Sequence, residues 1–441
     1  MRARSVLQAL DALDAQGRVT ALGKQLASLG LPPRLAQLVW LHRQQPVASA
    51  AMATAMILSE GDPLRSDGNT QADLHARLML WSQGSRDHQL QRGIWQRIQQ
   101  GVKQLAERIK TQWRPQAVDD PAIAAALAQA FPDRVAQVRA DHKQRYLMAN
   151  GRGAQLARED RLAGSPLLVV LDTDGAGTEP RIRLAVAITP AALETALASH
   201  LSQQTVVQWN SQRRAVEVEQ QKRLGSLILQ RRAMKQPWPE SAQTCLIDAV
   251  REDFSGLLPW DEEARQLQAR VNWLHQQFPE RWPDYSDETL RVELEEWLTP
   301  YLDSVYSAND LSRLSLAQML KAYLSWPLPQ QLDSEAPANW SLPTGSAPTL
   351  DYTVENGPVL RARMQEFYGL REHPTLPGGQ SLLVELLSPA HRPLQITRDL
   401  PGFWKGSYKE VAKEMRGRYP KHFWPENPSD AQATTRTKAK M

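Results

Sequence analysis

The chain has 441 residues, of which 42% are hydrophobic and 23% are charged, and its formal net charge is +4 at pH 7. These proportions are ordinary for globular proteins and exclude a chain that is disordered throughout. No apolar run approaches the length of a membrane span, and Asp11 and Asp14 interrupt the apolar stretch after the basic N-terminus, which argues against a secretory signal. We therefore expect a multidomain protein located in the cytoplasm.

Helical periodicity dominates the first 115 residues. Residues 4–29 predict two helices that flank a turn and a short strand, and further helices are predicted at residues 34–40, 48–58, 74–81 and 94–109. In the last of these, Ile94, Ile98 and Val102 begin an apolar stripe that is typical of an amphipathic helix in a bundle.

The hydrophobic period changes to two after Asn150. Leu167–Asp172 and Arg181–Ile188 flank a glycine-rich turn and predict a β-hairpin. Three more strands are predicted at residues 205–210, 215–220 and 226–232. About five short strands in under a hundred residues predict a small closed barrel.

The last 200 residues combine helices with irregular segments. An acidic, tryptophan-rich helical region is predicted from Pro237, and residues 332–358 read as a loop. Residues 359–370 predict a helix, residues 381–389 a strand or short helix, and residues 408–420 a basic helix. The expected fold class is a multidomain α+β protein.

Charge is distributed unevenly along the chain. Residues 1–115 carry 15 Lys and Arg against 8 Asp and Glu, residues 398–441 carry 10 against 5, and residues 240–310 carry 5 against 16. Two basic ends are typical of a polyanion-binding protein, although solvated faces also explain many charged runs.

Motifs of known enzymes are missing from the sequence. It contains no GxxxxGK[ST] loop for a triphosphate, and no GxSxG, HExxH or CxxC motif. The segment 172–179 is only faintly like a calcium loop, because its glycine comes too early and it lies between two strands, so we interpret it as a hairpin turn. We predict no catalytic residue, no metal ligand and no cofactor-binding residue in this chain.

One segment near the N-terminus carries a family resemblance. Leu10–Val39 reads LDALDAQGRVTALGKQLASLGLPPRLAQLV and resembles the winged helix and the start of the helical bundle in DEAH-box RNA helicases. The matching positions are Leu13, Asp14, Gly17, Thr20, Leu22, Gly23, Pro33, Arg34, Leu35 and Ala36. Met148–Leu156, Leu387–Pro393 and Asp399–Pro428 resemble segments of a bacterial branch of that family, which has its own C-terminal extension.

The resemblance implies a domain order. It predicts a partial winged helix at residues 1–33, a ratchet-like helical bundle at 34–125, an oligonucleotide-binding (OB-like) barrel at 126–235 and a mixed α/β C-terminal extension at 236–428. The polar residues 429–441 are expected to be a disordered tail.

The same resemblance implies a function. The chain is similar to the C-terminal, RNA-guiding accessory half of an ATP-dependent RNA helicase and lacks both RecA-like motor domains of that family. ATP and magnesium are therefore expected only in the missing motor domains, and this chain alone is expected not to hydrolyse ATP. The implied partners are single-stranded RNA and the motor domains, and no membrane. A motor-independent RNA-binding or protein-docking module is the alternative.

Four arginines are candidate RNA contacts in the barrel region. Arg152 and Arg158 flank a segment in which glycines would let a phosphate approach the backbone, and Arg181 and Arg183 alternate along one strand and so share a face. Solvated arginines at a strand edge are the alternative. Weaker candidates on the last predicted bundle helix are Arg97, Lys103 and Arg108.

The segment RGRYPKHFWPENP, residues 416–428, allows two interpretations. Its aromatic residues Tyr419, Phe423 and Trp424 would fasten the end of the chain to the extension. Alternatively, the basic residues would form a surface for RNA or another partner. The candidates for that second role are Arg416, Arg418 and Lys421, together with His422.

Overall fold

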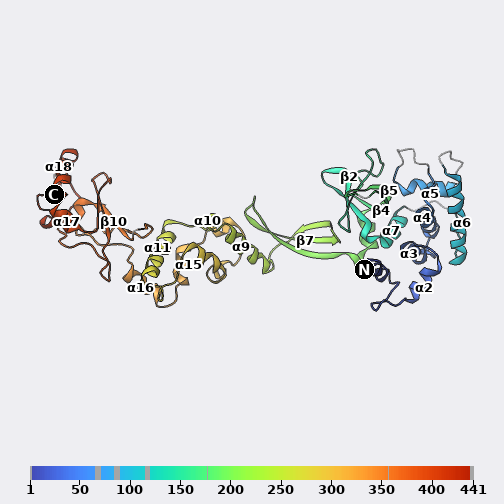
Figure 1. Ribbon diagram of the computed structural model, residues 1–441, viewed down its shortest axis with the longest axis horizontal. Helices are drawn as coiled ribbons and strands as arrows, with labels where there is room; N and C mark the ends of the chain where they lie inside the picture. Colours follow the sequence, from blue (N-terminus) through green and yellow to red (C-terminus); the bar gives the residue numbers. More distant parts are fainter. Residues whose placement is uncertain are drawn as a thin grey trace. The chain divides into compact units, whose positions relative to one another are not determined.

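The computed structural model describes residues 2–64, 71–83, 90–114, 120–175, 177–355 and 357–437. The chain forms two compact units (Figure 1), one made of Met1–Val206 with Glu219–Met234 and the other of Val207–Val218 with Lys235–Met441. A helical N-terminal region, a five-stranded barrel and a mixed α/β C-terminal region follow one another, so the predicted α+β fold class is confirmed.

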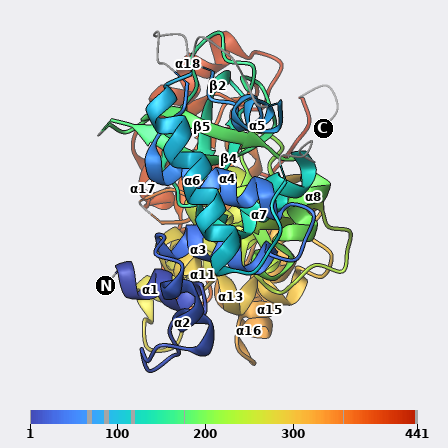
Figure 2. The same ribbon diagram turned by 90° about the vertical axis from the view of Figure 1, so that its right-hand side faces the viewer.

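The first unit begins with helices, and all of them except the last were predicted from the sequence. They are α1 (Arg2–Ala9), α2 (Ala21–Ser28), α3 (Pro33–His42), α4 (Ala48–Glu60), α5 (Leu74–Gln83), α6 (Arg92–Arg108) and α7 (Asp120–Ala130). The Thr20 side chain caps α2 by accepting the Gly23 amide, and Pro33 supplies the fixed φ that suits the first turn of α3. Because α4 consists largely of small residues, it is buried on most sides and packs closely against α3 and α6 (Figure 2).

A closed barrel follows, with strand order β1-β2-β3-β5-β4. Its strands are β1 (Val135–Arg139), β2 (His142–Met148), β3 (Gly153–Gln155), β4 (Leu167–Asp174) and β5 (Arg181–Ala187). The predicted hairpin is the antiparallel pair β4 and β5. Helix α8 (Pro190–Ala196) comes next, and a separate three-stranded sheet is formed by β6 (Ser202–Asn210), β7 (Ala215–Leu224) and β8 (Leu227–Ala233).

The prediction of which strands build the barrel was therefore wrong in part. The strands expected between residues 205 and 232 lie outside the barrel, and β1, β2 and β3 complete it instead. Those three strands are short and rich in polar residues: in β2 only Tyr146 and Met148 are buried. Their alternation was too weak to be recognised as a half-buried strand pattern.

Bundle and barrel share one hydrophobic core. Leu38 of α3, Ile98 of α6 and Leu127 of α7 belong to the same buried cluster as Val169 of β4 and Val186 of β5. A second, smaller cluster fills the barrel interior. The two parts of the first unit are thus packed together as a single body.

Short hydrogen bonds also join bundle and barrel. The segment before α5 runs beside β5, where the Ala185 amide donates to the Ala72 carbonyl at 2.8 Å. The Ala72 amide in turn donates to the Asp160 carboxylate at 2.7 Å. Both contacts lie between elements far apart in sequence, so they fix the bundle against the barrel.

The second unit is mainly helical before a small sheet. Its helices are α9 (Ser241–Glu252), α10 (Phe254–Leu257), α11 (Glu262–Gln277), α12 (Asp287–Val292), α13 (Leu294–Trp297), α14 (Ala308–Leu311), α15 (Leu316–Tyr323), α16 (Leu328–Glu335), α17 (Leu400–Lys405) and α18 (Tyr408–Arg418). The sheet has the order β12-β11-β10-β9, with β9 (Leu350–Asp351), β10 (Val359–Arg363), β11 (Leu383–Leu387) and β12 (Pro393–Thr397).

Two predictions in the second unit were wrong. The helix expected at residues 359–370 is replaced by strand β10, because pairing along its whole length with the parallel strand β11 buries Val359, Leu360 and Ala362. The tail expected to be disordered from residue 429 is packed around Thr434, which is buried and whose amide donates to the Gln365 carbonyl. Residues 438–441 lie outside the described part of the chain.

Candidate nucleic-acid interface

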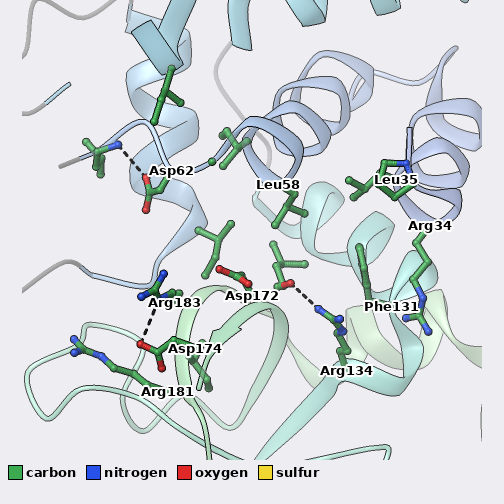
Figure 3. Close-up of a pocket in the computed structure, with 18 of the residues that line it drawn as sticks. Arg34, Leu35, Leu58, Asp62, Phe131, Arg134, Asp172, Asp174, Arg181 and Arg183 are labelled. Carbon is green, nitrogen blue, oxygen red and sulfur yellow. Dashed lines mark hydrogen bonds and ion pairs between the residues drawn. The ribbon is translucent and has the colours of Figure 1, made fainter. Parts of the chain in front are cut away.

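A cavity of about 830 Å³ lies in the first unit, between the helical bundle and the barrel (Figure 3). Helices α3, α4 and α6 supply one side and strands β4 and β5 the other. Its apolar lining residues include Leu35, Ile57, Leu58, Ile94, Leu171 and Leu184. The cavity combines an apolar wall with several charged groups, as ligand-binding sites commonly do.

Two predicted site residues, Arg181 and Arg183, line this cavity. Along β5 both arginines are exposed while Ile182 and Leu184 are buried, so the predicted shared face is present. The Arg183 Nε atom lies 3.3 Å from the Asp174 carboxylate, and the Arg183 side chain is still 64% exposed. Arg181 has no side-chain partner in the described ranges, which leaves its guanidinium available to an anion.

Two further arginines in the cavity wall were not predicted as site residues. Arg34 forms an ion pair with Asp133, and its guanidinium lies 5.5 Å from the centre of the Phe131 ring. Arg134 lies 5.6 Å from the same ring and donates to the Leu171 carbonyl at 2.7 Å. Both side chains are therefore held in place by contacts within the wall.

Three carboxylates also line the cavity, and two of them are neutralised. Asp174 faces Arg183, and Asp62 accepts a hydrogen bond from Arg77 at 2.6 Å. Arg77 is fully buried and also donates to the Gln71 and Asp73 carbonyls. The third carboxylate, Asp172, has no ion-pair or hydrogen-bond partner in the part of the chain that the structure describes.

The other arginines predicted near the barrel do not line the cavity. Arg152 lies in the turn between β2 and β3, where its amide donates to the Asn150 side chain at 3.0 Å. Arg158 follows β3 and, like Arg152, is exposed. A role of this pair in RNA binding stays a prediction.

The bundle arginines proposed as weaker candidates have structural partners. Arg97 pairs with Glu60 at 2.8 Å, and Arg108 donates to the Leu29 carbonyl at 2.9 Å. Lys103 borders a second, more open pocket beside the end of α6.

Two parts of the sequence match known families. Residues 3–31 match the winged-helix part of the helicase associated domain (HA2), and residues 297–428 match the family described as "ATP-dependent helicase C-terminal". Over 442 aligned residues the chain is 36% identical to the "ATP-dependent RNA helicase HrpB" of Escherichia coli (strain K12).

The chain is similar to the C-terminal half of HrpB. The alignment covers 99% of this chain and 52% of HrpB, so the chain spans about half the length of that relative. Two solved structures from E. coli are also similar. The "DExH-box NTPase HrpB" is 35% identical, and the alignment covers 99% of this chain and 52% of that chain. The "DEAH/RHA helicase HrpB" is 32% identical, and the alignment covers 96% of this chain and 51% of that chain. The TM-score is 0.45 in both cases.

The C-terminal basic and aromatic segment lies within the region that matches the HrpB-type family. Trp424 is only 5% exposed, and its indole Nε1 donates to the Tyr419 carbonyl at 3.2 Å. The Phe423 ring packs edge to face against the buried Tyr368 ring, with 6.2 Å between the two ring centroids. The Phe423 contact with Tyr368 and the burial of Trp424 agree with the interpretation that these two residues fasten the end of the chain, whereas the ring contact of Tyr419 is with His422 of the same segment.

The basic residues of that segment are less available than predicted. Arg416 donates to the Trp424 carbonyl at 3.1 Å, and Arg418 forms an ion pair with Glu414 at 3.3 Å. Lys421 is exposed and has no side-chain partner within the described residues. None of the three lies in the unit that contains the cavity, and RNA binding by them stays a prediction.

None of the described helices is long and apolar enough to cross a bilayer. Within the described ranges there is also no group of three or more His, Cys, Asp or Glu side chains arranged to hold a metal ion.

Proposed function

We propose that this chain is the RNA-guiding accessory half of an ATP-dependent RNA helicase similar to HrpB, and that its cavity binds single-stranded RNA. The observation that carries this proposal is the pair Arg181 and Arg183 at the cavity between bundle and barrel. The aligned relative is named an ATP-dependent RNA helicase, which supports RNA as the ligand.

The chemistry of the cavity suits an unpaired strand. The exposed guanidinium groups of Arg181 and Arg183 can donate hydrogen bonds to phosphate oxygens. The apolar wall can receive an unstacked base, which a duplex would keep inside its stack. Phosphate contacts provide affinity without sequence preference, which a helicase needs in order to move along a strand.

ATP hydrolysis belongs to the other half of the enzyme in this proposal. The motor domains would bind ATP and magnesium and would act on a strand that this half holds. The chain by itself is expected to bind RNA equally well with and without ATP and to show no ATPase activity.

The test is a salt titration of binding to a fluorescent single-stranded RNA. The variant Arg181→Ala/Arg183→Ala is compared with Arg152→Ala/Arg158→Ala, which removes the same charge from the barrel outside the cavity. Losing two phosphate contacts should flatten the slope of log K against log salt by about 1.4. We expect that change in the cavity variant and a smaller one in the other variant.

Equal slopes for the wild type and the cavity variant would contradict the cavity as the RNA site. A loss confined to the Arg152 and Arg158 variant would move the site to the turn after β2. If the wild-type chain binds no RNA at low salt, the alternative of a protein-docking module is favoured.

A further inference from the structure

We propose that the cavity also reads one base of the bound strand and that Asp172 selects guanine. This inference rests on the proposed function, because it assigns a base preference to the same cavity. It starts from the charges of the lining residues: Asp62 and Asp174 have arginine partners, whereas Asp172 has none among the described residues.

An unneutralised carboxylate is unfavourable in a site that reads phosphate alone, because it repels the backbone of the RNA. It becomes favourable where the ligand offers hydrogen-bond donors, since an ionised carboxylate is an acceptor at both oxygens. Asp172 is exposed and has no partner within the described residues, so its carboxylate is free to accept hydrogen bonds from a base edge that reaches this part of the cavity.

Local structure places Asp172 beside both kinds of neighbour. It lies at a bulge in β4, where the register with β5 shifts on either side of it, and its partner in the register is Leu184. The neighbouring residue on β5 is Arg183. In Figure 3 the Asp172 carboxylate lies between Arg183 and Arg134, with apolar side chains around it.

Guanine is the base that fits a lone carboxylate best. Its Watson–Crick edge presents two adjacent donors, the N1 hydrogen and the 2-amino group, which can bind both oxygens of one carboxylate at once. Adenine has no hydrogen on N1. In cytosine and uracil the donor is next to one or two acceptors, which would face the negative charge of Asp172.

Phosphate and base contacts can therefore be divided within one cavity. Arg181 and Arg183 would hold the backbone of any strand, and Asp172 would strengthen binding when the base beside it is guanine. The strand would pause at guanines while the remaining contacts stay independent of sequence.

The test uses four twelve-nucleotide uridine strands, in which the central position is uridine, adenosine, inosine or guanosine. Inosine keeps the N1 hydrogen and lacks the 2-amino group, so it measures one of the two hydrogen bonds. We expect the guanosine strand to bind about tenfold more tightly than the uridine strand, with inosine between them.

Two variants with the same loss of charge complete the test. Asp172→Asn should abolish the preference for guanosine without weakening the uridine strand. Asp141→Asn removes an exposed carboxylate in the turn between β1 and β2, outside the cavity lining, and should keep the preference.

Equal binding of all four strands by the wild type would overturn the base-reading role and leave the proposed RNA site intact. The base-reading role is also overturned if Asp172→Asn weakens the binding of every strand equally, since that outcome indicates a structural role for Asp172. If no strand binds at all, the proposed function fails together with this inference.

Discussion

The half-buried ion pair between Arg77 and Asp62 gives the sharpest test of the structure of the first unit. The two ends of the pair differ: Arg77 is fully buried, whereas the Asp62 side chain is 38% exposed at the cavity. A charge that water can reach needs its partner less than a charge that water cannot reach. Removing Asp62 should therefore lower the free energy of unfolding more than removing Arg77 does.

Asp62→Asn would leave the buried guanidinium without a counter-charge. The Gln71 and Asp73 carbonyls would still accept its hydrogen bonds, but the charge itself would stay uncompensated. We expect a loss of about 3–5 kcal/mol in the free energy of unfolding. Arg77→Met would instead leave a carboxylate that water can reach and two carbonyls without their donor. We expect this variant to lose about 2 kcal/mol in the free energy of unfolding.

Hydrogen exchange at the Ala185 amide measures this effect locally, because that amide donates to the carbonyl of Ala72, near the residues that Arg77 holds. A loss of about 4 kcal/mol should accelerate its exchange by about three orders of magnitude. Arg97→Met is the matched control, because the Arg97 pair with Glu60 is exposed and is worth less than about 1 kcal/mol. The reasoning is refuted if Arg77→Met destabilises the unit as much as Asp62→Asn does.

Three further predictions concern single sites. Gly225→Ala should lower the free energy of unfolding, measured by chemical denaturation, by at least about 2 kcal/mol, because Gly225 has φ +53° and a Cβ there would lie 2.3 Å from the Ala149 carbonyl oxygen. The control Gly345→Ala, which has open space around it, should lower it less. Burial opposes ionisation of Asp351, but hydrogen bonds from Thr353 and Arg361 outweigh it and lower the pKa of Asp351 to about 2. The pKa of an aspartate in the unfolded chain is about 3.9, so Asp351→Asn should lower the free energy of unfolding by about 2 kcal/mol at pH 7. This difference between the variant and the wild type should shrink as the pH falls from 4 towards 2. A difference that does not depend on pH would contradict the prediction. Trp424→Ala should lower the free energy of unfolding by about 3–5 kcal/mol and expose residues 422–437 to limited proteolysis. Unchanged protease resistance would argue against their fastening by this side chain.

Sequence periodicity predicted the part of the candidate site that depends on one strand. Arg181 and Arg183 share a face because side chains alternate in any strand, and the strand itself was evident from its apolar residues. Asp172 was interpreted only as part of a hairpin turn, because no local pattern shows which carboxylates lack a cation. That property depends on Arg77 and Arg183, which neutralise the other two carboxylates of the cavity.

Other features depend on contacts between distant residues and could not be read from the sequence. Helix propensity suggested a helix at residues 359–370, but a parallel neighbour more than twenty residues away makes it a strand. Arg416 was a candidate for RNA because it is basic and near the end of the chain, whereas its contact with the Trp424 carbonyl depends on how the segment folds back.

The common core of bundle and barrel has a mechanical consequence for the cavity. Leu35 and Ile57 on one wall belong to the same buried cluster as Leu171 and Leu184 on the other. The two walls of the cavity cannot separate without exposing that cluster to water. We therefore expect the cavity to keep a constant width. Under the proposed function, an RNA strand would fit by rotating its own bases, because the two walls stay at the same separation.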